Sequence, residues 1–340
     1  MDPRIASEDL IALVGSAARA PSLHNSQPWR FRLRENAVEL YSDPERMIPL
    51  VDPDGREMLI SCGAALYGLR LGLRRLGYLP VTELMPDPVR LGGTRPSTAP
   101  CLLARIRPGG LARPSRDELS MISALPHRHT HRGPFGPGRV PPRLLDALVE
   151  DAAAEGAELI LLSGPQATKL ARLTESARRQ QAASQWFQAE ERNWARPPGS
   201  TSRDGIPARA RPGAGPVSPM RRRPGEEPAH QRLAPRDFGS PGDLTPDGPL
   251  PSATAVLATA GDTPADWLQA GQALHRLLLR AATRWVFASL HSQALESPRL
   301  RAHVQDDLGL RAMPQLLLQF GRANTAAATP RRPVTDVIEA

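Results

Sequence analysis

The stretch Ala20-Pro21-Ser22-Leu23-His24-Asn25-Ser26-Gln27-Pro28-Trp29-Arg30-Phe31 follows a segment whose apolar residues recur with the spacing of a helix. It leads into a segment in which apolar and charged residues alternate, as in a strand. Its two prolines predict non-helical backbone at both flanks, because proline lacks an N–H and disfavours helix just before it. A turn held in this way presents backbone N–H groups and side-chain amides toward one point. That arrangement suits a flat heteroaromatic ring with carbonyl oxygens and ring nitrogens. An ordinary helix end, polar loop and strand start fits the same letters equally well.

Apolar periodicity and alternation predict the elements around this stretch. The first half reads as helices at 7–19 and 57–76 and strands at 29–34, 37–41, 78–85 and 101–106. The second half reads as helices at 117–125, 142–155, 166–190, 266–285 and 298–308, with strands at 158–162, 254–259 and 315–320. Helices and strands alternate without strict βαβ order, so the expected class is α+β.

Length and composition indicate the size of the core and the cellular compartment that we expect for the protein. The chain has 340 residues, enough for a large core or two ordinary domains. Its first residues lack the apolar segment of a signal peptide, and no apolar run reaches the roughly 18 residues of a membrane span. Cys62 and Cys101 give no disulfide framework, so we expect a reduced, cytoplasmic protein without a membrane partner. Cys62, in an apolar helix, is expected to be a small core residue.

The net charge of +8 is concentrated in one segment. Residues 192–236 hold ten arginines against three acidic residues, and the rest of the chain is nearly neutral. This segment is rich in proline and glycine and has almost no aromatic residues that could stack on bases. We therefore expect no nucleic-acid partner.

The opening stretch resembles the flavin-edge loop of the nitroreductase superfamily. It is most similar to the Acg family, which also has a histidine beside the asparagine and a following stretch like Asp43-Pro44-Glu45-Arg46. The resemblance implies bound FMN. It assigns cofactor binding to Pro21, Ser22, Asn25 and Gln27, with Ser22 and Asn25 on the flavin ring.

A second group of polar residues is Arg128-His129-Thr130-His131-Arg132. Guanidinium groups bind phosphate oxygens in a bidentate manner, and a hydroxyl adds a further donor. The stretch resembles the Arg-x-Ser-x-Arg-x-Phe segment of nitroreductases, which assigns Arg128, His129, Thr130 and Arg132 to the FMN phosphate and ribityl chain. A solvated basic loop is the alternative. The alternating histidines at 127, 129 and 131 also permit a metal site, but the neighbouring arginines would repel a cation, so no metal is expected.

Two further segments complete the implied cofactor site. Arg331 and Arg332 lie in a stretch that resembles the basic segment closing on the flavin phosphate, although a charged tail explains them nearly as well. Ser292 and Gln293 follow the second long apolar helix, where the family places backbone N–H groups near flavin N5. Trp285-Val286 departs from the Gly-Leu pair that the family usually has there.

Internal repetition suggests a duplicated architecture. The helix stretch Gly63–Leu73 resembles Gly271–Ala281, although two core helices can share a leucine pattern by chance. The resemblance implies two fused and diverged nitroreductase-type halves that mimic a dimer, at 1–113 and 114–340, with one flavin site between them. The chain is therefore expected to be a pseudo-dimeric monomer. A Pro/Gly/Arg-rich lid or insert is expected at about 194–251, with no structure assigned to 209–230.

The implied activity is NAD(P)H-dependent reduction of a nitroaromatic or quinone acceptor by a ping-pong mechanism. No motif of a nucleophile with its base, of a zinc protease or of a phosphate loop is present. None is required, because the flavin carries the chemistry and no catalytic side chain is expected. The alternative is a flavin-sequestering protein, in which a lid over FMN leaves little or no turnover.

Overall fold

The computed structural model describes residues 6–87, 99–132, 135–136, 138–210, 252–323 and 328–339. The first part of the chain builds one antiparallel sheet with strand order β1-β2-β4-β3. Its elements in chain order are α1 (Ser7–Ala17), β1 (Trp29–Arg34), β2 (Ala37–Ser42), α2 (Arg56–Arg75), β3 (Tyr78–Leu84) and β4 (Leu102–Leu111). The predicted hairpin turn at Glu35-Asn36 joins β1 to β2.

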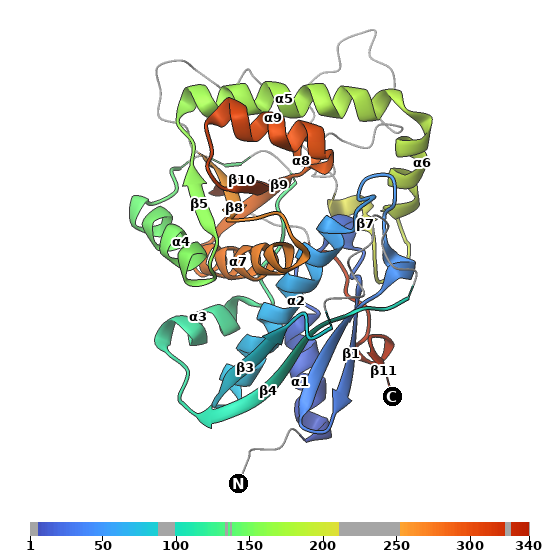
Figure 1. The fold of residues 1–340 in the computed structure, drawn as a ribbon, viewed down its shortest axis with the longest axis vertical. Coiled ribbons are helices and arrows are strands. Elements are labelled where there is room, and N and C mark those ends of the chain that lie inside the picture. The colour runs from blue at the N-terminus through green and yellow to red at the C-terminus, as the bar shows by residue number, and fades with distance from the viewer. Residues whose placement is uncertain are drawn as a thin grey trace.

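The second part repeats this plan. Its sheet has the order β5-β8-β10-β9, again with antiparallel pairs throughout. The elements are α4 (Pro142–Ala154), β5 (Glu158–Leu161), β8 (Ala253–Thr259), α7 (Pro264–Ala282), β9 (Val286–His291) and β10 (Met313–Arg322). Helix α3 (Arg116–Ala124) links the parts. Figure 1 shows α2 and α7 between the two sheets, which confirms the mixed α+β class.

Insertions distinguish the second part from the first. Between β5 and β8 the chain forms α5 (Gly164–Ala183), α6 (Gln185–Trp194) and the short strands β6 (Ala195–Arg196) and β7 (Ile206–Pro207). Residues 211–251 of the expected insert lie outside the described residues, as does most of the tract 209–230. Helices α8 (Gln293–Glu296) and α9 (Pro298–Leu308) separate β9 from β10.

Two helix boundaries differ from the sequence expectation. The single helix expected over 166–190 is two helices, because Ser184 adopts extended backbone (φ −93°, ψ 118°). The helix expected over 266–285 ends at Ala282, and β9 was not predicted from the sequence. The left-handed backbone of Trp285 (φ +54°) turns the chain from α7 into β9.

The central helices α2 and α7 cross at two glycines. A Cβ atom on Gly63 would overlap the carbonyl oxygen of Leu268, and one on Gly271 would overlap that of Ile60. Each glycine thus meets the residue three positions before the other glycine. This reciprocal contact places the repeated stretches about an approximate two-fold axis, with an offset of 208 residues between Gly63 and Gly271.

A separate hydrophobic cluster packs against each of the two sheets. Trp29, Phe31 and Leu66 belong to one core cluster, and Leu277 and Phe320 to a second. Cys62 is fully buried in the first cluster, as expected, and its thiol donates to the carbonyl of Pro28 (3.1 Å). Within the described ranges, no helix combines the length and apolar character needed to cross a bilayer.

The segment 328–339 returns to the first sheet. Strand β11 (Ile338–Glu339) pairs in parallel with β1, with Phe31 opposite Ile338. The N–H of Phe31 donates to the carbonyl of Val337 (2.8 Å). Residues 330–332 thereby lie beside the loop that precedes β1.

Candidate functional site

The loop between α1 and β1 has an unusual backbone. His24, Asn25 and Gln27 all have positive φ, at +48°, +58° and +54°. Non-glycine residues seldom adopt this region, and clusters of them are typical of functional sites. The Oγ atom of Ser22 accepts from the N–H of Gln27 (3.0 Å), which closes the turn. Pro21 is buried at its start.

The amides of Asn25 and Gln27 join three segments of the chain. Asn25 Nδ2 donates to the carbonyls of Gly205 (3.1 Å) and Pro330 (3.0 Å), and its Oδ1 accepts from Arg331 (2.9 Å). Gln27 Nε2 donates to the carbonyl of Arg203 (2.8 Å). Both side chains therefore bind protein groups in this structure and fix the loop against the insert and the segment 329–332.

Two arginines converge on the end of α1. Arg128 is 3% exposed and donates through Nη2 to the carbonyl of Arg19 (3.0 Å). Arg331 donates through its own Nη2 to the same carbonyl (3.4 Å) and to that of Ala20 (3.1 Å). The Nε and Nη1 atoms of Arg128 and the Nε atom of Arg331 are buried and have no hydrogen-bond partner among the described residues.

The electrostatics of this pair would favour an anion beside it. Burial lowers the pKa of Arg128 to about 10, with Arg132 and Arg19 adding repulsion. Burial and then Arg128 lower the pKa of Arg331 well below its usual value. Among the described residues, no carboxylate forms an ion pair with Arg128 or Arg331. Buried donors with excess positive charge are an environment that a phosphate group would satisfy.

Two imidazoles border the arginines. His129 is half-buried, and burial followed by Arg128 lowers its pKa to about 4. His275 of α7 is fully buried, and burial followed by Arg128 lowers its pKa to about 3. The Nδ1 atom of His275 lies 2.6 Å from the carbonyl of Ala64. Both rings are neutral near pH 7.

Sequence reasoning missed His275 as a site residue. His275 in α7 is equivalent to Tyr67 in the repeated stretch of α2. The two rings meet edge to face, with their centroids 5.9 Å apart. A buried histidine in an otherwise apolar helix face was the available signal.

The remaining predicted residues occupy β9 and its surroundings. Thr130 forms a parallel bridge with Ala288, which lays the segment 128–132 along β9. Arg132 donates to the carbonyl of Thr130 (3.4 Å). Ser292 donates to Glu296 (2.6 Å), and the Oε1 atom of buried Gln293 has no partner in the described part of the chain. These last two lie at the far end of β9, which begins at Val286.

Arg332 ties the site to the first sheet. Its backbone N–H donates to Gln27 Oε1 (2.8 Å), and its guanidinium lies 3.7 Å from buried Asp43. The three alternating histidines have separate surroundings. His127 lies beside Trp285, and His131 stacks on Phe135 at 4.7 Å. The described ranges contain no cluster of His, Cys, Asp and Glu that could hold a metal.

The described part of the insert is anchored to the loop. Asp204 pairs with Arg46 (2.9 Å) and with Arg196 (2.6 Å). The N–H of Gly205 donates to the carbonyl of Asn25 (3.3 Å). Within α6, Glu190 accepts from the backbone N–H groups of Leu50 and Val51. The sequence did not indicate these anchoring pairs.

Comparisons with known proteins supply the context for this geometry. No family model matches the sequence. A protein of Mycobacterium tuberculosis strain H37Rv, provisionally named an NAD(P)H nitroreductase, is 30% identical over 342 residues, covering 98% of this chain and 92% of that protein. The Acg protein of the same organism, which has the same kind of provisional name, is 27% identical over 346 residues, covering 99% and 97%. A solved nitroreductase with bound FMN from Bacteroides fragilis aligns with 12% identity over 62% of this chain and 93% of that one. Its TM-score of 0.35 is too low to support an argument.

Proposed function

Since this chain belongs to the nitroreductase family, in the branch that includes Acg, we propose that it binds FMN and acts as an NAD(P)H-dependent oxidoreductase. The acceptor would be a nitroaromatic compound or a quinone. FMN, when bound, supplies hydride chemistry in two half-reactions of a ping-pong cycle. The observation that carries the proposal is the pair of arginines at the end of α1, whose buried N–H donors include three with no partner in the described part of the chain.

The residues of the chain have distinct roles in this proposal. Arg128 and Arg331 hold the phosphate through the donors to which the described ranges offer no partner. Arg132, His129 and Thr130 surround it by family resemblance. The loop from Pro21 to Gln27 presents its turned backbone to the ring edge. Its side-chain amides act by holding that backbone in place, because they bind Gly205, Arg203 and the segment 330–332. Ser292 and Gln293 are assigned to the reactive edge of the ring.

Arg128→Ala and Arg331→Ala test the phosphate assignment. Each should weaken FMN binding about tenfold or more, because a charge-assisted hydrogen bond contributes roughly 1.5–3 kcal/mol. The measurement is titration of the apoprotein with FMN, followed by flavin fluorescence. Arg34→Ala is the matched control, since that side chain is 67% exposed and lies outside the site. Unchanged FMN affinity in both variants, with circular dichroism showing a folded chain, would refute the assignment.

The anchored insert favours a second candidate function, a flavin store with restricted turnover. Residues 203–205 bind Asn25, Gln27 and Arg46, so they lie against the loop proposed to meet the ring. An insert held there can limit access of a nicotinamide to the flavin. Adding NADPH and then a quinone to the purified protein separates the two functions. Rapid bleaching with reoxidation indicates the enzyme, and a spectrum that stays oxidised indicates the store.

We also propose that residues 1–113 and 114–340 are two nitroreductase-type halves of one fused chain. The support is the shared strand order of the two sheets and the reciprocal contact at Gly63 and Gly271. Two free, buried cysteines accord with a reducing compartment, so the cytoplasm is the proposed location.

A further inference from the structure

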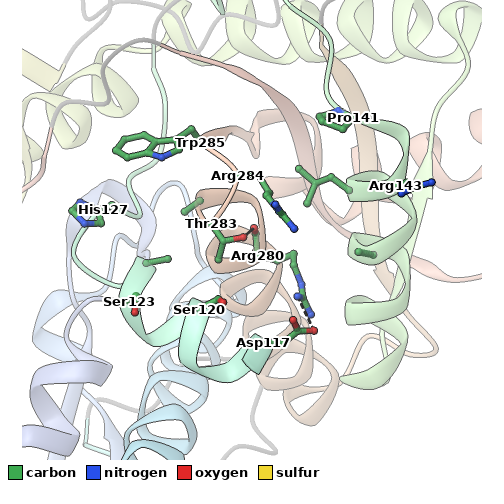
Figure 2. Close-up of a pocket in the computed structure, with 14 residues that line it drawn as sticks. Asp117, Ser120, Ser123, His127, Pro141, Arg143, Arg280, Thr283, Arg284 and Trp285 are labelled. Atoms are coloured by element: carbon green, nitrogen blue, oxygen red, sulfur yellow. Dashed lines mark hydrogen bonds and ion pairs between the residues drawn. The ribbon is translucent and has the colours of Figure 1, made fainter. Parts of the chain in front are cut away.

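A hollow of about 850 Å³ opens at the C-terminal end of α7 (Figure 2). The hollow is lined by helix α3, the start of α4, the last turn of α7 and the residues after it. The loop 21–27, Arg128 and Arg331 are not among its lining residues. Its size is within the range of small-molecule sites, roughly 300–1,000 Å³.

Trp285 at the edge of this hollow has an improbable backbone for its side chain. Its φ is +54°, and the equivalent residue in the first half of the chain, 208 positions earlier, is Gly77 with φ +87°. The N–H groups of both donate to the carbonyl three residues back, on Ala282 (3.1 Å) and Arg74 (3.0 Å). Strands β9 and β3 begin at the next residue in each case. Glycine is the usual solution for this helix ending, so tryptophan here is strained.

Core packing does not account for Trp285, because its side chain is 63% exposed. The indole lies 5.9 Å from the ring of His127 at an angle of 35°, and it meets Phe287 edge to face at 6.4 Å. Figure 2 shows Trp285 and His127 together on one side of the hollow. An exposed indole braced by two rings is a stacking surface for a planar aromatic molecule.

The charges that line the hollow favour an acidic ligand. Arg280 forms ion pairs with Asp117 (2.9 Å) and with Asp151 (2.6 Å). These pairs neutralise both Arg280 and the one carboxylate among the described residues that line the hollow, Asp117. Arg284 and Arg143 are exposed and form no ion pair with another described residue. Two guanidinium groups therefore remain available to an anion. In Figure 2, Arg284 lies between Trp285 and Arg280.

We propose that this hollow binds a planar aromatic molecule that carries an acidic group, with its ring on Trp285 and its anion on Arg284. Aryl carboxylates and nucleoside monophosphates share this chemistry. Two pairs of probes distinguish them: 2-naphthoate with neutral 2-naphthamide, and adenosine monophosphate with neutral adenosine. Within the preferred pair, the charged member should bind at least tenfold more tightly than the neutral member.

Calorimetric titration of the full chain tests the site. Trp285→Gly should weaken binding of the preferred acid at least tenfold, and it should fold, because glycine occupies the equivalent position 77. Arg284→Gln should weaken the acid similarly and leave the neutral analogue unchanged. Trp186→Ala is the matched control, since that indole is 68% exposed on α6 and lies outside the hollow; it should bind like the parent.

Three results would overturn the proposal. The first is that neither acid binds the parent at millimolar concentration. The second is equal binding to the parent and to folded Trp285→Gly. The third is self-association of the parent in sedimentation that Trp285→Gly removes, because Trp285 would then belong to an interface between copies of the chain.

Discussion

Gly77 and Trp285 provide a matched pair for measuring backbone strain at one helix ending. A Cβ at Gly77 would meet nothing within 4 Å, so Gly77→Ala adds conformational strain without a clash. We expect it to lower the free energy of unfolding by about 1–2 kcal/mol. At position 285 the same preference for glycine predicts that Trp285→Gly is more stable than Trp285→Ala by a similar free energy of unfolding. Urea unfolding of the three variants measures both differences. Equal stability of the two variants at 285 would show that their backbone relaxes.

Histidine protonation should make the fold sensitive to acid. The pKa of His275 is about 3 and that of His129 about 4, both below the ordinary value of 6.5. Between pH 6.5 and 4 the unfolded chain binds protons at these positions and the folded chain does not. The stabilisation is therefore present above pH 6.5 and is lost as the pH falls, by on the order of 1 kcal/mol per pH unit for each histidine.

His275→Gln tests this pH dependence and keeps a donor for the carbonyl of Ala64. The variant should show a smaller decrease in unfolding free energy between pH 6.5 and 4 than the parent. His303→Gln is the control, because that side chain is 57% exposed. A parent-like decrease in His275→Gln would mean that His275 takes up its proton without unfolding.

At the scale of elements, the crossing of α2 and α7 is the least tolerant contact. A Cβ on Gly63 or Gly271 would overlap a backbone oxygen, and the helices would have to separate. We expect Gly63→Ala and Gly271→Ala each to cost about 3 kcal/mol of unfolding free energy. Gly164→Ala, at the start of α5 with open space around it, should change stability by less than about 1 kcal/mol. Thermal unfolding of the three variants compares them, and a tolerated Gly63→Ala would contradict the close crossing.

The anchor of the insert offers a test of restricted access. Asp204→Ala removes the pairs with Arg46 and Arg196, which hold residues 203–205 near the loop. If this anchor limits access, the variant should bleach bound flavin faster with NADPH in stopped-flow measurements and should release FMN faster. Asp54→Ala is the control, because Asp54 is exposed and lies outside these contacts. If Asp204→Ala and Asp54→Ala bleach flavin and release FMN at equal rates, the anchor at Asp204 does not limit access to the flavin.

The elements differ in how far their sequence determined them. Alternation and turn residues in the sequence were enough for the first hairpin. A nearly continuous apolar run was enough for α2, because almost the whole of that helix is buried. Strand β9 escaped prediction because the glycine that normally ends a helix is replaced by Trp285. Composition indicated an insert near 194–251, but its docking on Asn25 depends on hydrogen bonds between residues 180 positions apart. No local pattern encodes such contacts.

For the whole molecule, the two proposed halves are not equivalent as binding sites. The long loop after α1 corresponds to a short turn after α4, where Glu155 pairs with Arg70 and Arg276. Asp151 on α4 pairs with Arg276 and Arg280. Carboxylates of the chain thus neutralise the arginines there, whereas Arg128 and Arg331 have no such partner among the described residues.

This asymmetry predicts one FMN per chain. The loop at Pro21–Gln27 and the segment Arg128–Arg132 each occur once, so one complete site can form. The measurement is the ratio of released flavin to protein after reconstitution with excess FMN. A ratio near two would require a second site at the Glu155 cluster. No bound flavin at all would refute the cofactor assignment itself.

The return of residues 328–339 to the first sheet has a consequence for biosynthesis. Gln27 and Arg332, which meet in the site, are 305 residues apart. At about 5–20 residues per second, a ribosome needs roughly 15–60 s to make the chain between them. During that interval β1 waits without β11, and the strained loop lacks the contacts that hold Asn25. The nascent protein can therefore assemble its first sheet before residues 330–332 exist, but its loop gains the contacts that hold Asn25 and Gln27 only after those residues have been made.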